Sequence, residues 1–171
     1  MKNKGFTVLE SIVAIAILSL SVAGVFSAVQ QGLSQAIIAK DEVKAFYLAQ
    51  EAVEIIRNKR DTNQLSRLGG GSNNWLSGIT DATNCPFGKV CRADAIDNSL
   101  TFCGDAWDSC PVLKQDSNFL YGYIGNTTNF KREIQIEFIS ADEIAVIVKI
   151  SWTKGIITRD FKAKTLLFNW I

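Results

Sequence analysis

The stretch that decides the fold is M-K-N-K-G-F-T-V-L-E-S-I-V-A-I-A-I-L-S-L-S-V-A-G-V-F-S-A-V, residues 1–29. It begins with a short basic leader and a Gly-Phe junction, and Glu10 then precedes a run without charged side chains from Ser11 to Val29. As a helix, residues 6–29 would be roughly 36 Å long, which is enough to span a bilayer. A carboxylate in such a segment costs free energy. We therefore expect a membrane helix in which Glu10 has a partner.

The N-terminal segment has three other interpretations. A secretory signal peptide has a similar basic start, and Ser21-Val22-Ala23 could serve as its cleavage site. Glu10 and the continuation of the apolar run to Val29 count against it. An uncleaved single-pass anchor explains the helix but not the Gly-Phe-x-x-x-Glu spacing. A soluble core helix is rarely apolar on all faces over this length.

The segment G-F-T-V-L-E, with lysines before the glycine and an apolar helix after the glutamate, resembles the class III signal of type IV pilins and type II secretion pseudopilins. The resemblance implies cleavage after Gly5 by the membrane prepilin peptidase, followed by methylation of the new N-terminus at Phe6. It also implies that Glu10 pairs with the N-terminal ammonium of a neighbouring subunit. Within an apolar helix bundle each charge would neutralise the other.

The helical pattern continues beyond the apolar run. Apolar residues recur at three- and four-residue steps up to Ile56, with charged residues on the other face, so residues 30–60 are predicted to form an amphipathic continuation. Only Gly24 and Gly32 interrupt residues 6–60, where proline is absent. These glycines mark either a bend or a site of close packing. One helix of about 55 residues is expected.

The block A-Q-E-A-V-E-I-I-R-N-K-R-D, residues 49–61, is similar to the helix end of minor pilin subunits of the PilV and secretion I type. The cations Arg57, Lys59 and Arg60 lie in the expected last turn, where the helix dipole favours them. This block is either a solvated helix end or a contact between subunits.

The composition indicates an exported, non-catalytic chain. It contains no histidine, which excludes Ser-His-Asp and Cys-His catalytic arrangements and His-ligated metal sites. The formal net charge of +1 gives no indication of a nucleic-acid partner. We expect no enzyme activity, no catalytic residue, no cofactor and no metal.

The four cysteines, Cys85, Cys91, Cys103 and Cys110, lie in one polar region. An even number in an exported domain favours disulfides, and four cysteines allow three connectivities. Pairing of neighbours, Cys85 with Cys91 and Cys103 with Cys110, is preferred because Pro86, Gly88 and Gly104 suit tight loops. A zinc site is one alternative, although its usual spacings are shorter than those found here. Reduced, partly buried cysteines are the other.

The globular head is expected to comprise residues 61–171. Residues 62–117 are predicted to be a long loop region stapled by the cysteines, with Trp75, Phe102 and Trp107 as anchors or ligand contacts. Residues 119–171 alternate with a period of two, which predicts an antiparallel β-sheet of three to four strands. One face of this sheet is apolar and requires a cover.

The fold class that follows is α+β and pilin-like, with a long N-terminal α-helix packed on a C-terminal antiparallel β-sheet. The expected organisation is a leader at residues 1–5, a membrane or filament-core helix at 6–29, its amphipathic continuation at 30–60, and the head.

The resemblance implies a structural subunit, a minor pilin or pseudopilin of a type IV pilus or related secretion or DNA-uptake filament. Its partners would be the prepilin peptidase, other pilin subunits and membrane lipid. It would reside in the cytoplasmic (inner) membrane, with its head outside the cytoplasm, before entering a cell-surface or periplasmic filament. The alternative is a single-pass, membrane-anchored binding or adhesion protein that does not polymerise.

Overall fold

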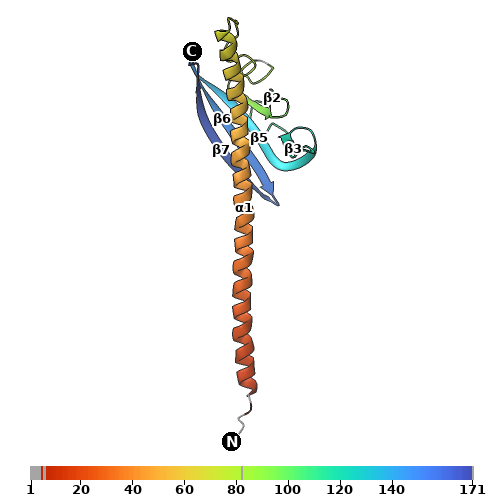
Figure 1. Ribbon diagram of the computed structural model, residues 1–171. Coiled ribbons are helices and arrows are strands. Elements are labelled where there is room, and N and C mark those ends of the chain that lie inside the picture. Colours follow the sequence, from red (N-terminus) through yellow and green to blue (C-terminus); the bar gives the residue numbers. More distant parts are fainter. Residues whose placement is uncertain (1–4, 6, 82, 171) are drawn as a thin grey trace. The chain divides into compact units, whose positions relative to one another are not determined.

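The computed structural model describes residues 5, 7–81 and 83–170 of the 171-residue chain. It divides into two compact units, Met1–Glu42 and Val43–Ile171. One α-helix and seven β-strands make up its regular structure in the described residues (Figure 1). They are α1 (Val8–Leu68), β1 (Val90–Asp94), β2 (Ser99–Gly104), β3 (Val112–Gln115), β4 (Tyr121–Gly122), β5 (Asn126–Ser140), β6 (Glu143–Lys154) and β7 (Ile157–Phe168).

Helix α1 is 61 residues long and continues beyond Arg60, where the sequence pattern suggested that it would end. Three glycines stop it. Gly70 has a φ of 87°, its N–H donates to the Arg67 carbonyl, and the Gly71 N–H donates to the Ser66 carbonyl. This is a Schellman motif, in which a residue without a Cβ adopts the left-handed conformation. The helix is uninterrupted at Gly24 and Gly32.

The α+β architecture predicted from the sequence is confirmed, since the C-terminal part of α1 packs on an antiparallel sheet within the second unit. Residues along one stripe of the helix contact the apolar face of the sheet. The buried helix residues at this contact are Ala45, Leu48, Ala49, Ala52, Ile55 and Ile56. Three of the six are alanines.

The strands β5, β6 and β7 form the predicted antiparallel meander. Phe130 lies opposite Trp152 and Ile136 opposite Val146 in the β5–β6 pair. The β6–β7 pair runs without interruption from Glu143 opposite Phe168 to Lys154 opposite Ile157. Every second side chain therefore enters the core, as the period of two predicted.

The prediction of three to four strands in residues 119–171 is confirmed, but the sheet is larger and has seven strands in the described residues. Residues 119–171 supply four of them, but β1, β2 and β3 come from the region predicted to be a loop. Strand β1 pairs with β2 and with β5, and β3 pairs with β4 and β5. These strands are only four to six residues long. Such segments give almost no periodic signal; pairing with β5 stabilises β1 and β3, and pairing with β1 stabilises β2.

Candidate functional site: the N-terminal segment and the stapled face of the head

The first turn of α1 is capped by Thr7. Its side-chain Oγ1 accepts a hydrogen bond from the backbone N–H of Glu10 at 3.3 Å, and its carbonyl accepts one from the Ser11 N–H at 3.2 Å. Thr7 and Glu10 have the T-x-x-E spacing of a capping box. Glu10 also places its negative charge in the first turn, where the helix dipole favours it. The sequence reasoning missed Thr7, although this spacing could have identified it.

The sequence-predicted processing residues lie immediately before this turn. Gly5 is exposed, whereas Phe6 lies outside the described residues. Glu10 is also exposed, and no cationic side chain pairs with its carboxylate among the residues that the structure describes. Within one copy of the chain, the described residues therefore supply no counter-charge for Glu10.

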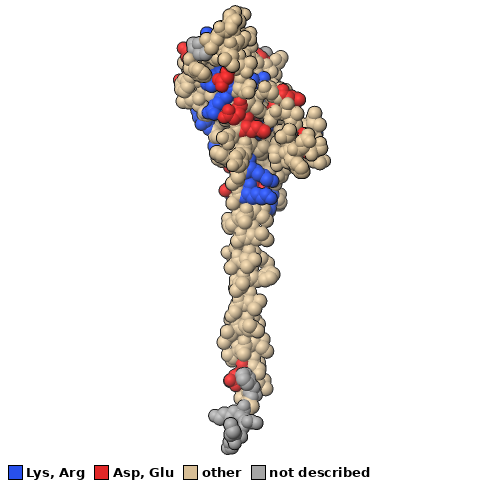
Figure 2. Space-filling view, viewed as in Figure 1, with Lys and Arg blue, Asp and Glu red and all other residues tan. Residues whose placement is uncertain are grey.

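The apolar part of α1 has large exposed side chains on all its faces. Leu9 is 74% exposed, Phe26 65% and Leu33 63%. In the described part of the chain, α1 alone is long and apolar enough to cross a membrane, with a mean hydropathy of 2.5 in its most apolar window. Figure 2 shows its visible surface as an almost uncharged column above the first turn. Such a surface requires lipid or other apolar helices around it.

The cysteines form two disulfides, Cys85–Cys91 and Cys103–Cys110. This is the pairing that the loop residues Pro86, Gly88 and Gly104 favoured, and it leaves no thiolate to bind zinc. No group of three or more potential metal-ligating side chains occurs in the described residues. Gly104 is required beside the second disulfide, since a Cβ there would lie 2.7 Å from the Ser109 Oγ.

The second disulfide holds the loop between Cys103 and Cys110, called here the stapled loop, over the outer face of the sheet. The outer face is the one opposite α1. There the carboxylate of Glu133 on β5 is fully buried and accepts two backbone hydrogen bonds from the loop. One comes from the Asp108 N–H at 3.0 Å and the other from the Cys110 N–H at 3.1 Å. In the period-two pattern of β5, Glu133 belongs to the polar series that lies opposite the apolar face. The loop changes its environment by covering it.

Two of the aromatic residues predicted to be anchors or ligand contacts fix loops to the rest of the head. The Trp75 Nε1–H donates to the Ala141 carbonyl at 3.2 Å, and Trp75 is only 4% exposed. The Trp107 ring lies 5.8 Å from the Lys149 Nζ and 5.5 Å from the Lys162 Nζ. These contacts are cation–π interactions that attach the stapled loop to β6 and β7.

Glu51 in the 49–61 block has an intramolecular role. Its carboxylate pairs with the guanidinium of Arg132 on β5, which is fully buried in the contact between helix and sheet. Arg132 also donates to the Leu48 carbonyl at 3.4 Å and to the Ala93 carbonyl at 2.8 Å. The signal for this pair was an arginine in an otherwise apolar series of inward-facing residues.

Two pKa values in the head depart from their usual range. Burial raises the pKa of Tyr123 to about 12, with the charges of Arg132 and Arg92 partly opposing it. Hydrogen bonds from the Thr83 side chain and the Asn84 backbone lower the pKa of Asp81. The lowered pKa of Asp81 reflects the hydrogen bonds of a local turn.

Residues 1–26 match the family described as the prokaryotic N-terminal methylation motif. This match supports a type IV pilin-like precursor, which is a class of structural subunits that are processed by a prepilin peptidase and assemble with other pilins. Together with the apolar helix, it suggests a membrane-anchored pilin. Searches of curated proteins and of solved structures found no match to the chain.

Proposed function

We propose that this chain is a minor pilin or pseudopilin, a structural subunit of a type IV pilus or of a related secretion or DNA-uptake filament. In this proposal the prepilin peptidase removes residues 1–5 by cleavage after Gly5, and Phe6 becomes the methylated N-terminus. The chain resides in the inner membrane with its head outside the cytoplasm until it enters the filament. The observation that carries the proposal is the methylation motif at residues 1–26 joined to an apolar helix with Glu10 in its first turn.

Glu10 would guide assembly by pairing with the N-terminal ammonium of Phe6 in a neighbouring subunit. An unpaired charge near apolar surroundings is costly, and the described residues of one copy supply no cation to Glu10. A second subunit can supply this cation while its own apolar helix covers the exposed residues of α1. The same contact would therefore satisfy the charge and bury apolar surface.

The processing step is tested by N-terminal sequencing and intact mass of the chain made in a cell that contains a prepilin peptidase. We expect a product that begins at methylated Phe6 and contains both disulfides. A chain that retains Met1, or that begins after Ala23, would contradict the proposal. It would favour the membrane-anchored binding protein that does not polymerise.

The assembly step is tested separately with Glu10→Ala. This change removes the carboxylate but retains the backbone N–H that donates to Thr7, so the helix cap is preserved. We expect normal cleavage and membrane insertion but strong depletion of the variant from purified filaments. Ser21→Ala is the control in the same helix, because the Ser21 hydroxyl donates only to the Ile17 carbonyl. Equal incorporation of both variants would exclude the assembly role of Glu10.

A further inference from the structure

The strand β7 lies at an edge of the sheet. Among the described residues, β6 is the only strand that pairs with it. It is 12 residues long, contains no proline, and pairs with β6 without a register shift. Natural proteins usually interrupt or cover an edge of this length, because its outer N–H and C=O groups can pair with another strand.

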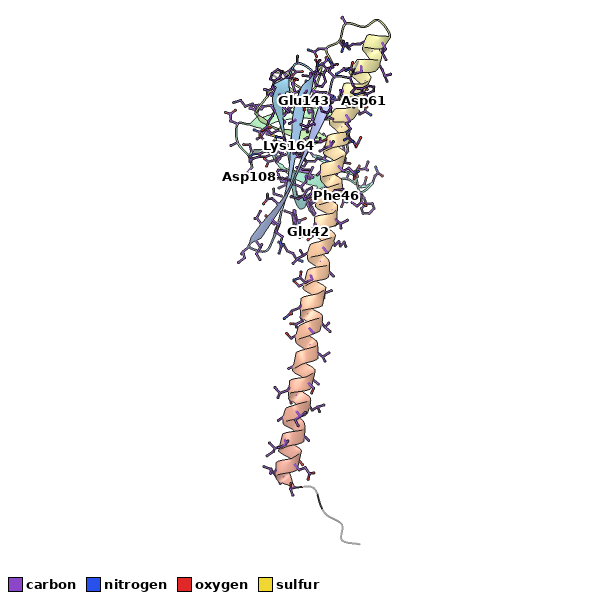
Figure 3. The ribbon with its side chains drawn as sticks, turned by 90° about the vertical axis from the view of Figure 1, so that its left-hand side faces the viewer. Glu42, Phe46, Asp61, Asp108, Glu143 and Lys164 are labelled. Carbon is purple, nitrogen blue, oxygen red and sulfur yellow. A yellow bond between two sulfur atoms is a disulfide. The ribbon has the colours of Figure 1, made fainter. Side chains whose placement is uncertain are left out.

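A groove runs beside this edge, between α1 and β7. Its volume is about 220 Å³. Its apolar lining residues are Phe46, Ala49 and Val53 from the helix and Phe161 and Ala163 from the strand, and Gln50, Glu54, Arg57 and Thr165 complete the lining. Phe46 and Phe161 contact each other edge to face, with ring centroids 6.1 Å apart. We call this the edge groove; Figure 3 shows β7 beside α1, with Phe46 labelled on the helix and Lys164 on the strand.

The edge groove is below the usual size of small-molecule pockets, which is about 300–1,000 Å³. It has the arrangement used for β-strand addition, in which an extended peptide pairs with a sheet edge and places alternate side chains in an adjacent pocket. A strand added to β7 would direct every second side chain toward the groove. Apolar side chains fit the part of the groove that Phe46, Val53, Phe161 and Ala163 line.

The other side chains of the added strand would lie beside Lys162 and Lys164. These two lysines are exposed on the face of β7 opposite the groove. Lys162 contacts the Trp107 ring, and Lys164 pairs with Glu137 at 3.0 Å. Acidic side chains would form favourable cross-strand pairs with these lysines, whereas basic ones would be repelled.

Whether a second copy of this chain fits the same edge depends on the register of pairing. If two copies of β7 paired antiparallel about Ala163, Lys162 of each would lie opposite Lys164 of the other, whereas pairing about Lys162 would place Asp160 of each opposite Lys164 of the other. Like charges directly opposite each other in a ladder are destabilising. From the two exposed lysines beside the groove we propose that the β7 edge and the edge groove bind an extended segment of a different protein, with alternating apolar and acidic residues; pairing with a second copy is an outcome that the tests below distinguish.

The proposal is tested with two short blocked peptides, one of alternating valine and glutamate and the other of alternating valine and lysine. Binding to the full chain in detergent micelles is followed by fluorescence anisotropy at low ionic strength. We expect the glutamate peptide to bind about tenfold more tightly, since two favourable cross-strand charge pairs replace two unfavourable ones. Equal affinities for the two peptides would overturn the proposal.

Charge reversal identifies the site. Lys162→Glu with Lys164→Glu should reverse the preference, so that the lysine peptide binds more tightly. Loss of folding cannot produce this gain. The control, Lys89→Glu with Lys114→Glu, makes the same change of charge away from β7 and should leave the preference for glutamate unchanged. A preference that both double variants alter equally would overturn the proposal.

Two further measurements test the geometry. Ala163→Leu fills the edge groove and should weaken binding of the glutamate peptide. Hydrogen–deuterium exchange should show that the peptide protects backbone amides of β7. Protection confined to other elements would overturn the proposal, as would dimerisation through β7 that competes with the peptide, because the edge would then belong to a second copy.

Discussion

Arg132 and Glu51 join the sheet to the helix through a charge pair whose guanidinium is fully buried. The Glu51 side chain is 37% exposed, so water can solvate its carboxylate if Arg132 is removed. The Arg132 side chain is fully buried, so water cannot solvate its guanidinium if Glu51 is removed. The two residues are 81 positions apart in the chain. Their pairing fixes the register of α1 against β5, because it also positions the guanidinium to bind the carbonyls of Leu48 and Ala93.

Glu51→Ala should therefore lower the free energy of unfolding of the full chain by about 1–3 kcal/mol, less than a fully buried pair because Glu51 is partly solvated. Urea unfolding in detergent micelles measures this change. The control is Glu54→Ala, which removes the exposed pair with Arg57 and should change the free energy by at most about 0.5 kcal/mol. In the double variant Glu51→Ala with Arg132→Met, the loss in free energy of unfolding should differ from the sum of the losses in the two single variants. Additive losses would show that the residues act independently.

Glu133→Gln should destabilise the stapled loop. The carboxylate accepts one N–H on each oxygen, whereas the amide of glutamine would direct its own N–H₂ at one of these donors. We expect a loss of about 1–3 kcal/mol, with faster amide exchange at Asp108 or Cys110. Glu137→Gln, on the same strand and the same face, affects only an exposed pair with Lys164 and should be nearly neutral. Equal effects of the two changes would contradict the role of Glu133.

Removal of the Cys103–Cys110 disulfide should release the loop that covers Glu133. The bridge closes a short loop, with a sequence separation of 7. The chain-entropy estimate for Cys103→Ser with Cys110→Ser is a loss of roughly 2 kcal/mol. Amide exchange at Asp108 should become faster. The matched control, Cys85→Ser with Cys91→Ser, should leave exchange at Asp108 unchanged, and acceleration in both variants would indicate a general loss of structure.

The stability of the head should decrease at alkaline pH because of Tyr123. Its pKa rises from 10.0 to about 12 in the folded chain, mainly through burial. Between these values the unfolded chain loses the phenolic proton while the folded chain retains it. The contribution is therefore complete below pH 10.0 and is lost as the pH rises toward about 12.

The loss attributable to Tyr123 is at most about 2–3 kcal/mol. It is measured as the difference in free energy of unfolding between the wild-type chain and Tyr123→Phe across this range of pH. Lysines and the other tyrosines titrate in both proteins, so the difference isolates Tyr123. If the two profiles remain parallel, the pKa of Tyr123 is not raised by folding.

Several features of this fold were readable from local sequence alone. The uncharged run after Glu10 gives the apolar helix, since side chains at every angle around the axis are apolar. The alternation in residues 130–138 and 144–152 gives two central strands, because successive side chains point to opposite faces. Pro86, Gly88 and Gly104 favoured tight loops between neighbouring cysteines, which is the disulfide pairing that the structure contains.

The tertiary structure alone decided the environments of Arg132 and Glu133. Adjacent in sequence, they point to opposite faces of β5, and both are buried because α1 covers one face and the stapled loop the other. It also decided that β1, β2 and β3 are strands, because their pairing with each other and with β5 stabilises segments too short to carry a period. Local patterns report which face of an element is apolar. Which distant segment covers that face depends on contacts across the chain, and these exist only once the chain has folded.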